Sequence, residues 1–235
     1  MTWLHHGAPP DRSGGGDITL TLRPPAHSSY ISIPPRGRPV GLKLVAFDLD
    51  GTLANLPIDW DALRARVREF MGTDHPLKPL GPSIPVAARG DKELEEAAFR
   101  IVEEAELEAA RQARPDPELR GALEALRSRG VRIALVTLQA RRPALTALEG
   151  LGVRDLFDVV VTREKGMSRD DQLAEAMREV GAKPEETALV GDMPWDAEAG
   201  RKLGVFTVIV GEKAQGDRNV SSAAEAARLL MEMDP

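Results

Sequence analysis

Residues 43–56 read KLVAFDLDGTLANL, and this stretch decides the fold. A short apolar run ends abruptly at two aspartates, Asp48 and Asp50, which are followed by Gly51 and Thr52. A continuous apolar run of this length is typical of a strand that is covered on both faces. Two carboxylates at the end of a buried strand repel each other and lose hydration. Their repulsion is tolerable when a hard dication such as Mg²⁺, which prefers oxygen ligands, lies between them.

Composition and charge narrow the class of protein. The chain has 235 residues, enough for one sizeable α/β domain or for a core with a small accessory domain. It is 42% hydrophobic and 29% charged, which is ordinary for a soluble globular protein. Its formal net charge of −6 argues against nonspecific binding to nucleic acid or to an anionic membrane, because both need a positive field. The absence of cysteine excludes disulfides and thiol catalysis. With neither a secretory signal pattern nor an apolar run near the roughly 18 residues of a membrane span, we expect a cytoplasmic protein.

The first 41 residues differ from the rest of the chain. They are rich in proline, glycine and serine and carry few large apolar side chains. Such a segment does not bury enough apolar surface to offset the entropy lost when a chain is ordered. We therefore expect residues 1–41 to form a flexible tail.

Beyond the first apolar run, strand patterns alternate with helical patterns. Further runs that predict strands lie at 131–137, 157–161, 187–190 and 204–210. The helical patterns between them lie at 143–151, 169–180 and 195–203. Alternation of this kind predicts an α/β fold with a doubly wound parallel sheet and right-handed crossovers.

One connection is too long for a simple crossover. More than 80 residues separate the first predicted strand from the second, where a single helix would suffice. Helical patterns at 59–71 and 92–111 lie in this connection, on either side of a stretch rich in proline. We expect residues 55–115 to form a small α-helical cap over the acidic strand end. Residues 42–54 and 116–235 would then form the core domain.

Groups capable of chemistry follow several predicted strands at the point where each strand ends. Besides Asp48 and Asp50, they are Thr137, Lys165, Arg169, Asp192 and Asp196. In doubly wound sheets, ligands bind at the carboxyl ends of the strands. We therefore expect these side chains to gather at one edge of the sheet.

The order and spacing of these groups resemble a known superfamily. DLDGTL at residues 48–53, a strand-end threonine, a downstream lysine and GDMPWD at residues 191–196 together resemble the haloacid dehalogenase (HAD) superfamily. Within it, the chain is similar to the phosphatases with a helical cap, close to phosphoglycolate phosphatase-like proteins. The resemblance covers about residues 42–212. It implies Mg²⁺-dependent hydrolysis of a small phosphorylated metabolite through an aspartyl-phosphate.

The resemblance also implies a role for each residue near the first strand. An aspartate carboxylate is able to attack phosphorus, and Asp48 takes this role. Asp50 lies two residues further along an extended chain, points the same way and acts as general acid and base. Thr137 donates a hydrogen bond to a phosphoryl oxygen. Gly51 and Thr52 belong to a sharp turn whose amides bind phosphate oxygens.

Two further roles implied by the resemblance concern cations. Asp48 and Asp192 supply side-chain ligands to Mg²⁺, Asp50 supplies its backbone carbonyl, and Asp196 completes the acidic cluster. A positively charged side chain also offsets charge in the transition state.

The identity of that side chain stays open between two residues. The family usually has Lys-Pro before a helix, whereas residues 163–173 here read REKGMSRDDQL. The family's usual spacing back from Gly191 falls near Met167, between Lys165 and Arg169. We favour Lys165 as the motif cation and assign Arg169 to substrate binding at the start of a helix.

Two other functions compete with a phosphatase. A sugar-phosphate mutase shares the acidic pair but returns the phosphoryl group to its substrate, and a noncatalytic phospho-acceptor module also gathers acids, threonine and lysine at strand ends. For Trp60, on the apolar stripe of the first cap helix, we expect packing rather than contact with a substrate.

Overall fold

The structure is a computed structural model that describes residues 37–233. Most of the predicted tail, residues 1–41, therefore lies outside the described residues. Within residues 37–233, no helix combines the length and the apolar character that a membrane span needs.

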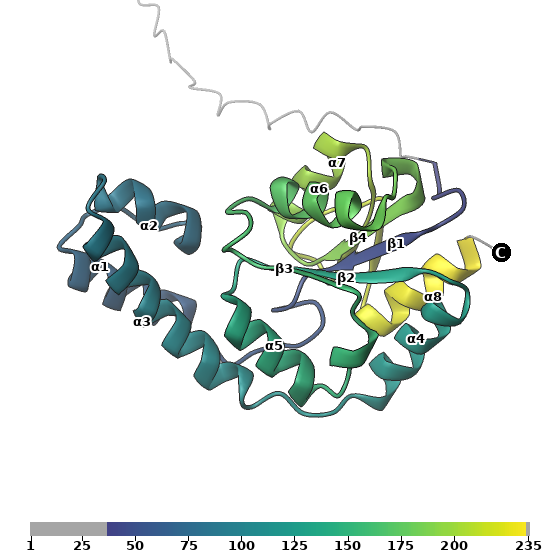
Figure 1. Cartoon of the computed structure of the whole chain (residues 1–235), viewed down its shortest axis with the longest axis horizontal. Helices are drawn as coiled ribbons and strands as arrows, with labels where there is room; N and C mark the ends of the chain where they lie inside the picture. The colour runs from purple at the N-terminus through teal and green to yellow at the C-terminus, as the bar shows by residue number, and fades with distance from the viewer. Residues whose placement is uncertain (1–36, 234–235) are drawn as a thin grey trace, which may run out of the picture. The chain divides into compact units, whose positions relative to one another are not determined.

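A parallel six-stranded sheet forms the centre of the described chain (Figure 1). Its strands are β1 (Leu44–Phe47), β2 (Arg132–Val136), β3 (Val159–Val161), β4 (Thr187–Gly191), β5 (Phe206–Val210) and β6 (Arg218–Val220). Their spatial order is β3-β2-β1-β4-β5-β6, so β1 lies between β2 and β4. The predicted fold class, a doubly wound parallel α/β sheet, is confirmed.

Helices cover both faces of this sheet (Figure 1). One face carries α4 (Pro117–Ser128), α5 (Arg141–Gly150) and α8 (Ala223–Met233), and the other carries α6 (Arg169–Val180) and α7 (Pro194–Leu203). Two short 3₁₀ helices, η1 (Arg154–Leu156) and η2 (Pro184–Glu186), precede β3 and β4. Val45 and Phe47 of β1 pack on the first face, whereas Leu44 and Ala46 pack on the second. Burial on both faces accounts for the continuous apolar run in the sequence.

Three helices lie between β1 and α4, within residues 55–115, which we call the cap segment. They are α1 (Trp60–Met71), α2 (Leu80–Ala88) and α3 (Lys92–Ala110). They share a hydrophobic cluster that includes Leu63, Val67, Ile84 and Val102. Because this cluster is separate from the two beside the sheet, the cap segment has a small core of its own.

Local capping fixes where α6 begins, and this matters for the site. The Ser168 hydroxyl accepts a hydrogen bond from the N–H of Asp171 at 3.2 Å, the usual contact of an N-cap residue. At the other end, Gly181 adopts a left-handed conformation that stops the helix. Arg169 is therefore the first residue of α6, beside the carboxyl ends of the strands.

Candidate active site

Three neighbouring strand ends bring the predicted site residues together. Asp48, Thr137 and Asp192 each directly follow a strand, and these strands, β1, β2 and β4, lie side by side. The backbone N–H of Asp48 donates to the carbonyl of Val190 at 2.9 Å, which extends the pairing of β1 with β4 up to the site. Carboxylate oxygens of Asp48, Asp192 and Asp196 lie within 4.8 Å of one another.

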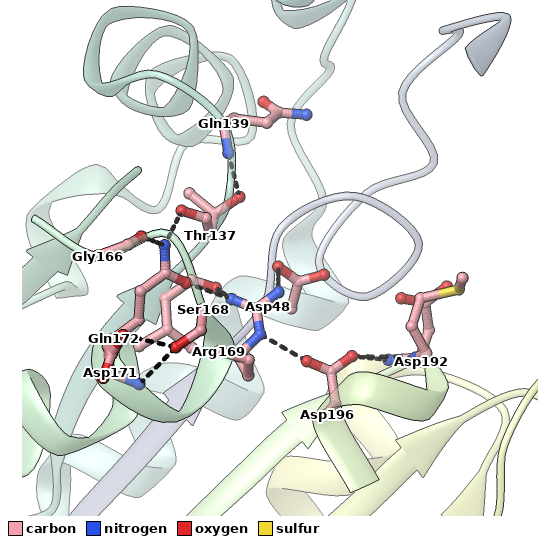
Figure 2. A network of polar contacts seen from close by, with 12 residues as sticks. Asp48, Thr137, Gln139, Gly166, Ser168, Arg169, Asp171, Gln172, Asp192 and Asp196 are labelled. Carbon is pink, nitrogen blue, oxygen red and sulfur yellow. Dashed lines mark hydrogen bonds and ion pairs between the residues drawn. The ribbon is translucent and has the colours of Figure 1, made fainter. Parts of the chain in front are cut away.

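Arg169 lies at the centre of this group (Figure 2). Its Nη2 donates to Asp48 Oδ1 and its Nε to Asp196 Oδ1, both at 2.6 Å. Its Nη1 donates to the carbonyl of Val136, at the end of β2, and to Gln172 Oε1 at 2.9 Å. The residue is only 4% exposed. One guanidinium thus links Asp48, which follows β1, and Asp196 of α7 to the end of β2 and to α6.

Burial and the ion pairs of Arg169 with the acids shift the pKa values of these groups in opposite directions. The pKa of Asp48 is raised to about 7, and burial is the largest cause. The nearby carboxylates of Asp196 and Asp192 also raise this pKa, whereas Arg169 lowers it. Burial alone would lower the pKa of Arg169, but Asp48 and Asp196 raise it by more, so the guanidinium stays charged. A dication bound between Asp48 and Asp192 would stabilise both as carboxylates.

Lys165, the residue favoured as the motif cation, lies elsewhere. Its Nζ contacts Glu179 at 2.7 Å and Glu175 at 3.7 Å, both on α6, and its side chain is 48% exposed. It does not line the cavity that contains Asp48, whereas Arg169 does. The positions of the two candidates are therefore the reverse of what we expected. The side chain that lies among the acids is that of Arg169, and Lys165 lies outside the site.

Both carboxylate oxygens of Asp196 accept hydrogen bonds within the site. While Oδ1 accepts from Arg169, Oδ2 accepts from the backbone N–H groups of Asp192 at 3.2 Å and Met193 at 3.0 Å. A Cβ at residue 191 would lie 2.3 Å from Asp196 Cγ, so Gly191 is needed for this close approach. Asp196 therefore holds the turn after β4, and no oxygen of its carboxylate is left without a partner.

Asp192 has an oxygen that fits a metal ion. Its Oδ2 accepts from Lys213 Nζ at 2.6 Å, but its Oδ1 is buried and has no partner among the described residues. A buried carboxylate oxygen without a partner is costly, and a hard cation would satisfy it. A side chain at Gly51 would lie 2.3 Å from Oδ2, so glycine is also required there. The donors present fit Mg²⁺.

Asp50 is held by residues of the cap segment. Its Oδ1 accepts from the N–H of Leu56 at 2.9 Å, and its Oδ2 accepts from the indole N–H of Trp60 at 3.0 Å. Burial raises the pKa of Asp50, while these two hydrogen bonds and Lys213 lower it. Trp60 packs on the cap cluster as predicted, but it also contacts the site, which the sequence did not indicate.

Thr137 and Thr52 occupy different surroundings. The buried Thr137 Oγ1 accepts from the N–H of Gln139 at 3.3 Å, and the residue lines the same cavity as Asp48. Thr52 is buried too, but it lines a second cavity of about 510 Å³ behind the Asp48–Thr52 loop, and its hydroxyl has no partner among the described residues. Gly51 borders both cavities. The predicted set is therefore brought together except for Lys165 and Thr52.

A cavity of about 440 Å³ contains the acidic groups, and its walls come from both the core and the cap segment. Besides Asp48, Asp50, Asp192 and Arg169, its lining includes Trp60, Glu106, Gln139, Arg163 and Lys213. This volume suits a small molecule. Lys213 was missed in the sequence, although it follows the end of β5 by three residues and reading that strand end would have found it.

This fold and this arrangement of acids define a class of enzyme. A model of the haloacid dehalogenase-like hydrolase family matches residues 45–210, more than half of the chain. The chain therefore belongs to the haloacid dehalogenase-like hydrolases, and the predicted superfamily and enzyme class are confirmed.

Individual proteins of known name and structure are similar to this chain. It is 28% identical over 215 residues to the phosphoglycolate phosphatase of Chromobacterium violaceum, an alignment that covers 80% of this chain and 96% of that protein. It is 35% identical over 98 residues to pyrophosphatase PpaX of Halalkalibacterium halodurans, covering 40% of this chain and less than half, 46%, of PpaX. A haloacid dehalogenase-like hydrolase structure from Streptococcus pneumoniae matches with a TM-score of 0.61 at 20% identity, covering 80% of this chain and 98% of that one, which shows the shared fold.

Proposed function

We propose that this protein is a Mg²⁺-dependent phosphatase that hydrolyses a small phosphorylated metabolite through an aspartyl-phosphate on Asp48. The observation that carries the proposal is the buried cluster in which Asp48 lies within reach of Asp192, Asp196 and a single guanidinium. Membership of the hydrolase family and similarity to a protein named phosphoglycolate phosphatase support it. The small cavity suits a metabolite rather than a macromolecular substrate.

In the first step, an Asp48 carboxylate oxygen forms a bond to phosphorus, and the bond between phosphorus and the ester oxygen breaks. The departing oxygen takes a proton from Asp50, whose raised pKa suits an acid. In the second step, water attacks phosphorus and gives a proton to Asp50. The bond to Asp48 then breaks, and inorganic phosphate and the free carboxylate are regenerated.

Arg169 is our choice for the motif cation in this reaction. Its contact with Asp48 orients the nucleophile, and its charge offsets negative charge that spreads over the phosphoryl oxygens. Thr137 and the backbone at Gly51 would contact those oxygens from the other strand end and the turn.

Asp48 and Asp192 would hold Mg²⁺, together with the backbone carbonyl of Asp50. When bound, Mg²⁺ neutralises the acids and polarises the phosphoryl group. Because both Asp196 oxygens already accept hydrogen bonds, we propose that Asp196 positions Arg169 and the turn after β4 instead of binding the ion.

Phosphate release and its dependence on Mg²⁺ test this function directly. We expect the protein to release inorganic phosphate from 4-nitrophenyl phosphate and from small phosphorylated metabolites, to lose this activity with EDTA, and to regain it with Mg²⁺. Mg²⁺ should also raise the melting temperature of the wild type but not of Asp192→Asn, since binding to the folded state alone stabilises it. Conversion of a hexose phosphate without phosphate release would instead identify a mutase.

The Trp60–Asp50 hydrogen bond predicts a defined kinetic loss. Trp60→Phe keeps an aromatic ring in the cap cluster but removes the N–H that donates to Asp50. We expect kcat to fall by about 10-fold, the usual cost of a lost hydrogen bond to a charged group, with little change in KM. Trp195→Phe is the matched control, because Trp195 lines the same cavity without a hydrogen bond to Asp50. Equal losses in both variants would contradict a positioning role for Trp60.

A further inference from the structure

Gln139 carries a buried amide that has no hydrogen-bond partner among the described residues. The residue is 3% exposed and lines the cavity that contains Asp48. Both its side-chain oxygen and its side-chain nitrogen lack a partner, whereas its backbone N–H donates to Thr137 Oγ1. In Figure 2 the amide extends away from the cluster around Arg169, on the far side of Thr137. Because an unpaired buried amide is costly, a ligand group that hydrogen-bonds to it would gain binding energy.

A buried ion pair lies beside Gln139 and joins the cap segment to the core. Arg163 Nη1 donates to both oxygens of Glu106 on α3, at 2.7 and 2.8 Å, and the backbone N–H of Arg163 donates to the Gln139 carbonyl at 3.2 Å. Glu106 Oε2 also accepts from the N–H of Ala140 at 3.1 Å. The Arg163 guanidinium lies over the ring of Phe99, 5.3 Å from its centre. The pair is therefore fixed from several sides.

Every cationic side chain that lines this cavity in the described part of the chain is already paired with a carboxylate. Arg64 pairs with Asp61, Arg163 with Glu106, Arg169 with Asp48 and Asp196, and Lys213 with Asp192. A Mg²⁺ ion bound by Asp48 and Asp192 would add positive charge to the cavity, but the phosphoryl dianion of the substrate would neutralise it. Among the described residues that line the cavity, no unpaired cation is therefore left for a second anionic group on the substrate.

We propose that Gln139, together with the Arg163–Glu106 pair, forms a leaving-group subsite that takes an uncharged, hydroxyl-bearing leaving group and discriminates against a carboxylate. This inference rests on the proposed phosphatase function and specifies its substrate class. An amide offers one acceptor and donors, and a hydroxyl both donates and accepts, so a hydroxyl satisfies both orphaned atoms. A carboxylate only accepts, and it would leave the amide oxygen facing negative charge.

A matched set of esters tests the subsite with the wild-type protein. The probes are 2-hydroxyethyl phosphate and glycerol 3-phosphate, against n-propyl phosphate and phosphoglycolate, all with Mg²⁺. Burial raises the pKa of Glu106 to about 7 and Arg163 opposes this, so assays at pH 8 keep the pair mostly ionised. We expect kcat/KM for the better hydroxylated ester to exceed that for n-propyl phosphate and that for phosphoglycolate by about 10-fold or more.

A variant then assigns the discrimination to Gln139. In Gln139→Met, the ratio of kcat/KM between the hydroxylated ester and n-propyl phosphate should fall by about 10-fold, toward one. Gln215→Met, an exposed glutamine outside the cavity, is the control and should retain the wild-type ratio. The wild-type comparison does not depend on whether the variant folds.

The outcomes separate this inference from the function on which it rests. A wild type that hydrolyses 4-nitrophenyl phosphate but prefers phosphoglycolate, or treats propyl and hydroxylated esters alike, overturns the subsite and leaves the phosphatase standing. An unchanged ratio in Gln139→Met also overturns it. If no phosphate ester is hydrolysed at all, the proposed function itself fails.

Discussion

Replacing Asp48 with Asn is expected to lower the rate of phosphate release by about 10³-fold or more, because an amide does not attack phosphorus as a carboxylate does. The side chain keeps its size, so KM for 4-nitrophenyl phosphate should change far less than kcat. The measurement is steady-state phosphate release with Mg²⁺ at several substrate concentrations. A loss confined to kcat would place the effect in the chemical step.

The control for this variant is Asp74→Asn, which changes an exposed loop aspartate of the cap segment in the same way. It should retain nearly all of the wild-type activity. A melting temperature of Asp48→Asn close to that of the wild type would show that the protein still folds. Residual activity of more than a few per cent in a folded Asp48→Asn protein would contradict the assignment of the nucleophile.

Arg169→Met is expected to affect both stability and activity. The variant removes the cation that contacts Asp48 and Asp196, and it leaves two buried carboxylates without their shared partner. Removing one partner of a buried ion pair, while the other stays buried, lowers the free energy of unfolding by about 3–5 kcal/mol. We therefore expect a lower denaturation midpoint in urea and, in the protein that remains folded, loss of most phosphatase activity.

Lys165→Met separates the two candidate cations. The Lys165 ammonium is exposed and pairs with glutamates on the surface of α6, so its loss should change stability little and leave kcat near the wild-type value. The opposite pattern, with an inactive Lys165→Met and an active Arg169→Met, would return the role to Lys165. Mg²⁺ should be present in both assays, because it changes the charge that surrounds Asp48.

The sheet was predictable because its central strands are covered on both faces. Continuous apolar runs such as residues 42–47 leave little alternative to a buried strand, and five of the strands were predicted from such runs. No element was predicted after residue 210. β6 is a three-residue edge strand, Arg218–Val220, with no buried residue and thus no apolar pattern to detect.

Helix α2 was missed for a different reason. Its sequence, LGPSIPVAA, contains a glycine and two prolines, which argue against a helix on propensity alone. One proline, Pro82, lies in the first turn, where its missing N–H costs nothing. The buried side chains of Leu80 and Ile84 pack in the cap cluster, so tertiary packing outweighs propensity here.

The candidate site was predictable where it depends on strand order and was not where it depends on side-chain direction. Asp48, Thr137 and Asp192 follow adjacent strands, and parallel pairing alone brings them to one edge. The choice between Lys165 and Arg169 depends on where the Ser168 cap starts α6 and which way each side chain points from it. Spacing along the chain contains no such information.

The most direct test of the account is to trap the phosphoryl group on Asp48. Asp50→Asn lacks the base that activates water, but 4-nitrophenolate leaves without needing a proton, so the first step should proceed and the second should stall. With Mg²⁺ and 4-nitrophenyl phosphate, we predict a burst of about one nitrophenolate per protein and a phosphoryl group on the Asp48 peptide by mass spectrometry after an acid quench. A burst that survives in the Asp48→Asn, Asp50→Asn double variant, or a phosphoryl group on a different residue, would contradict it.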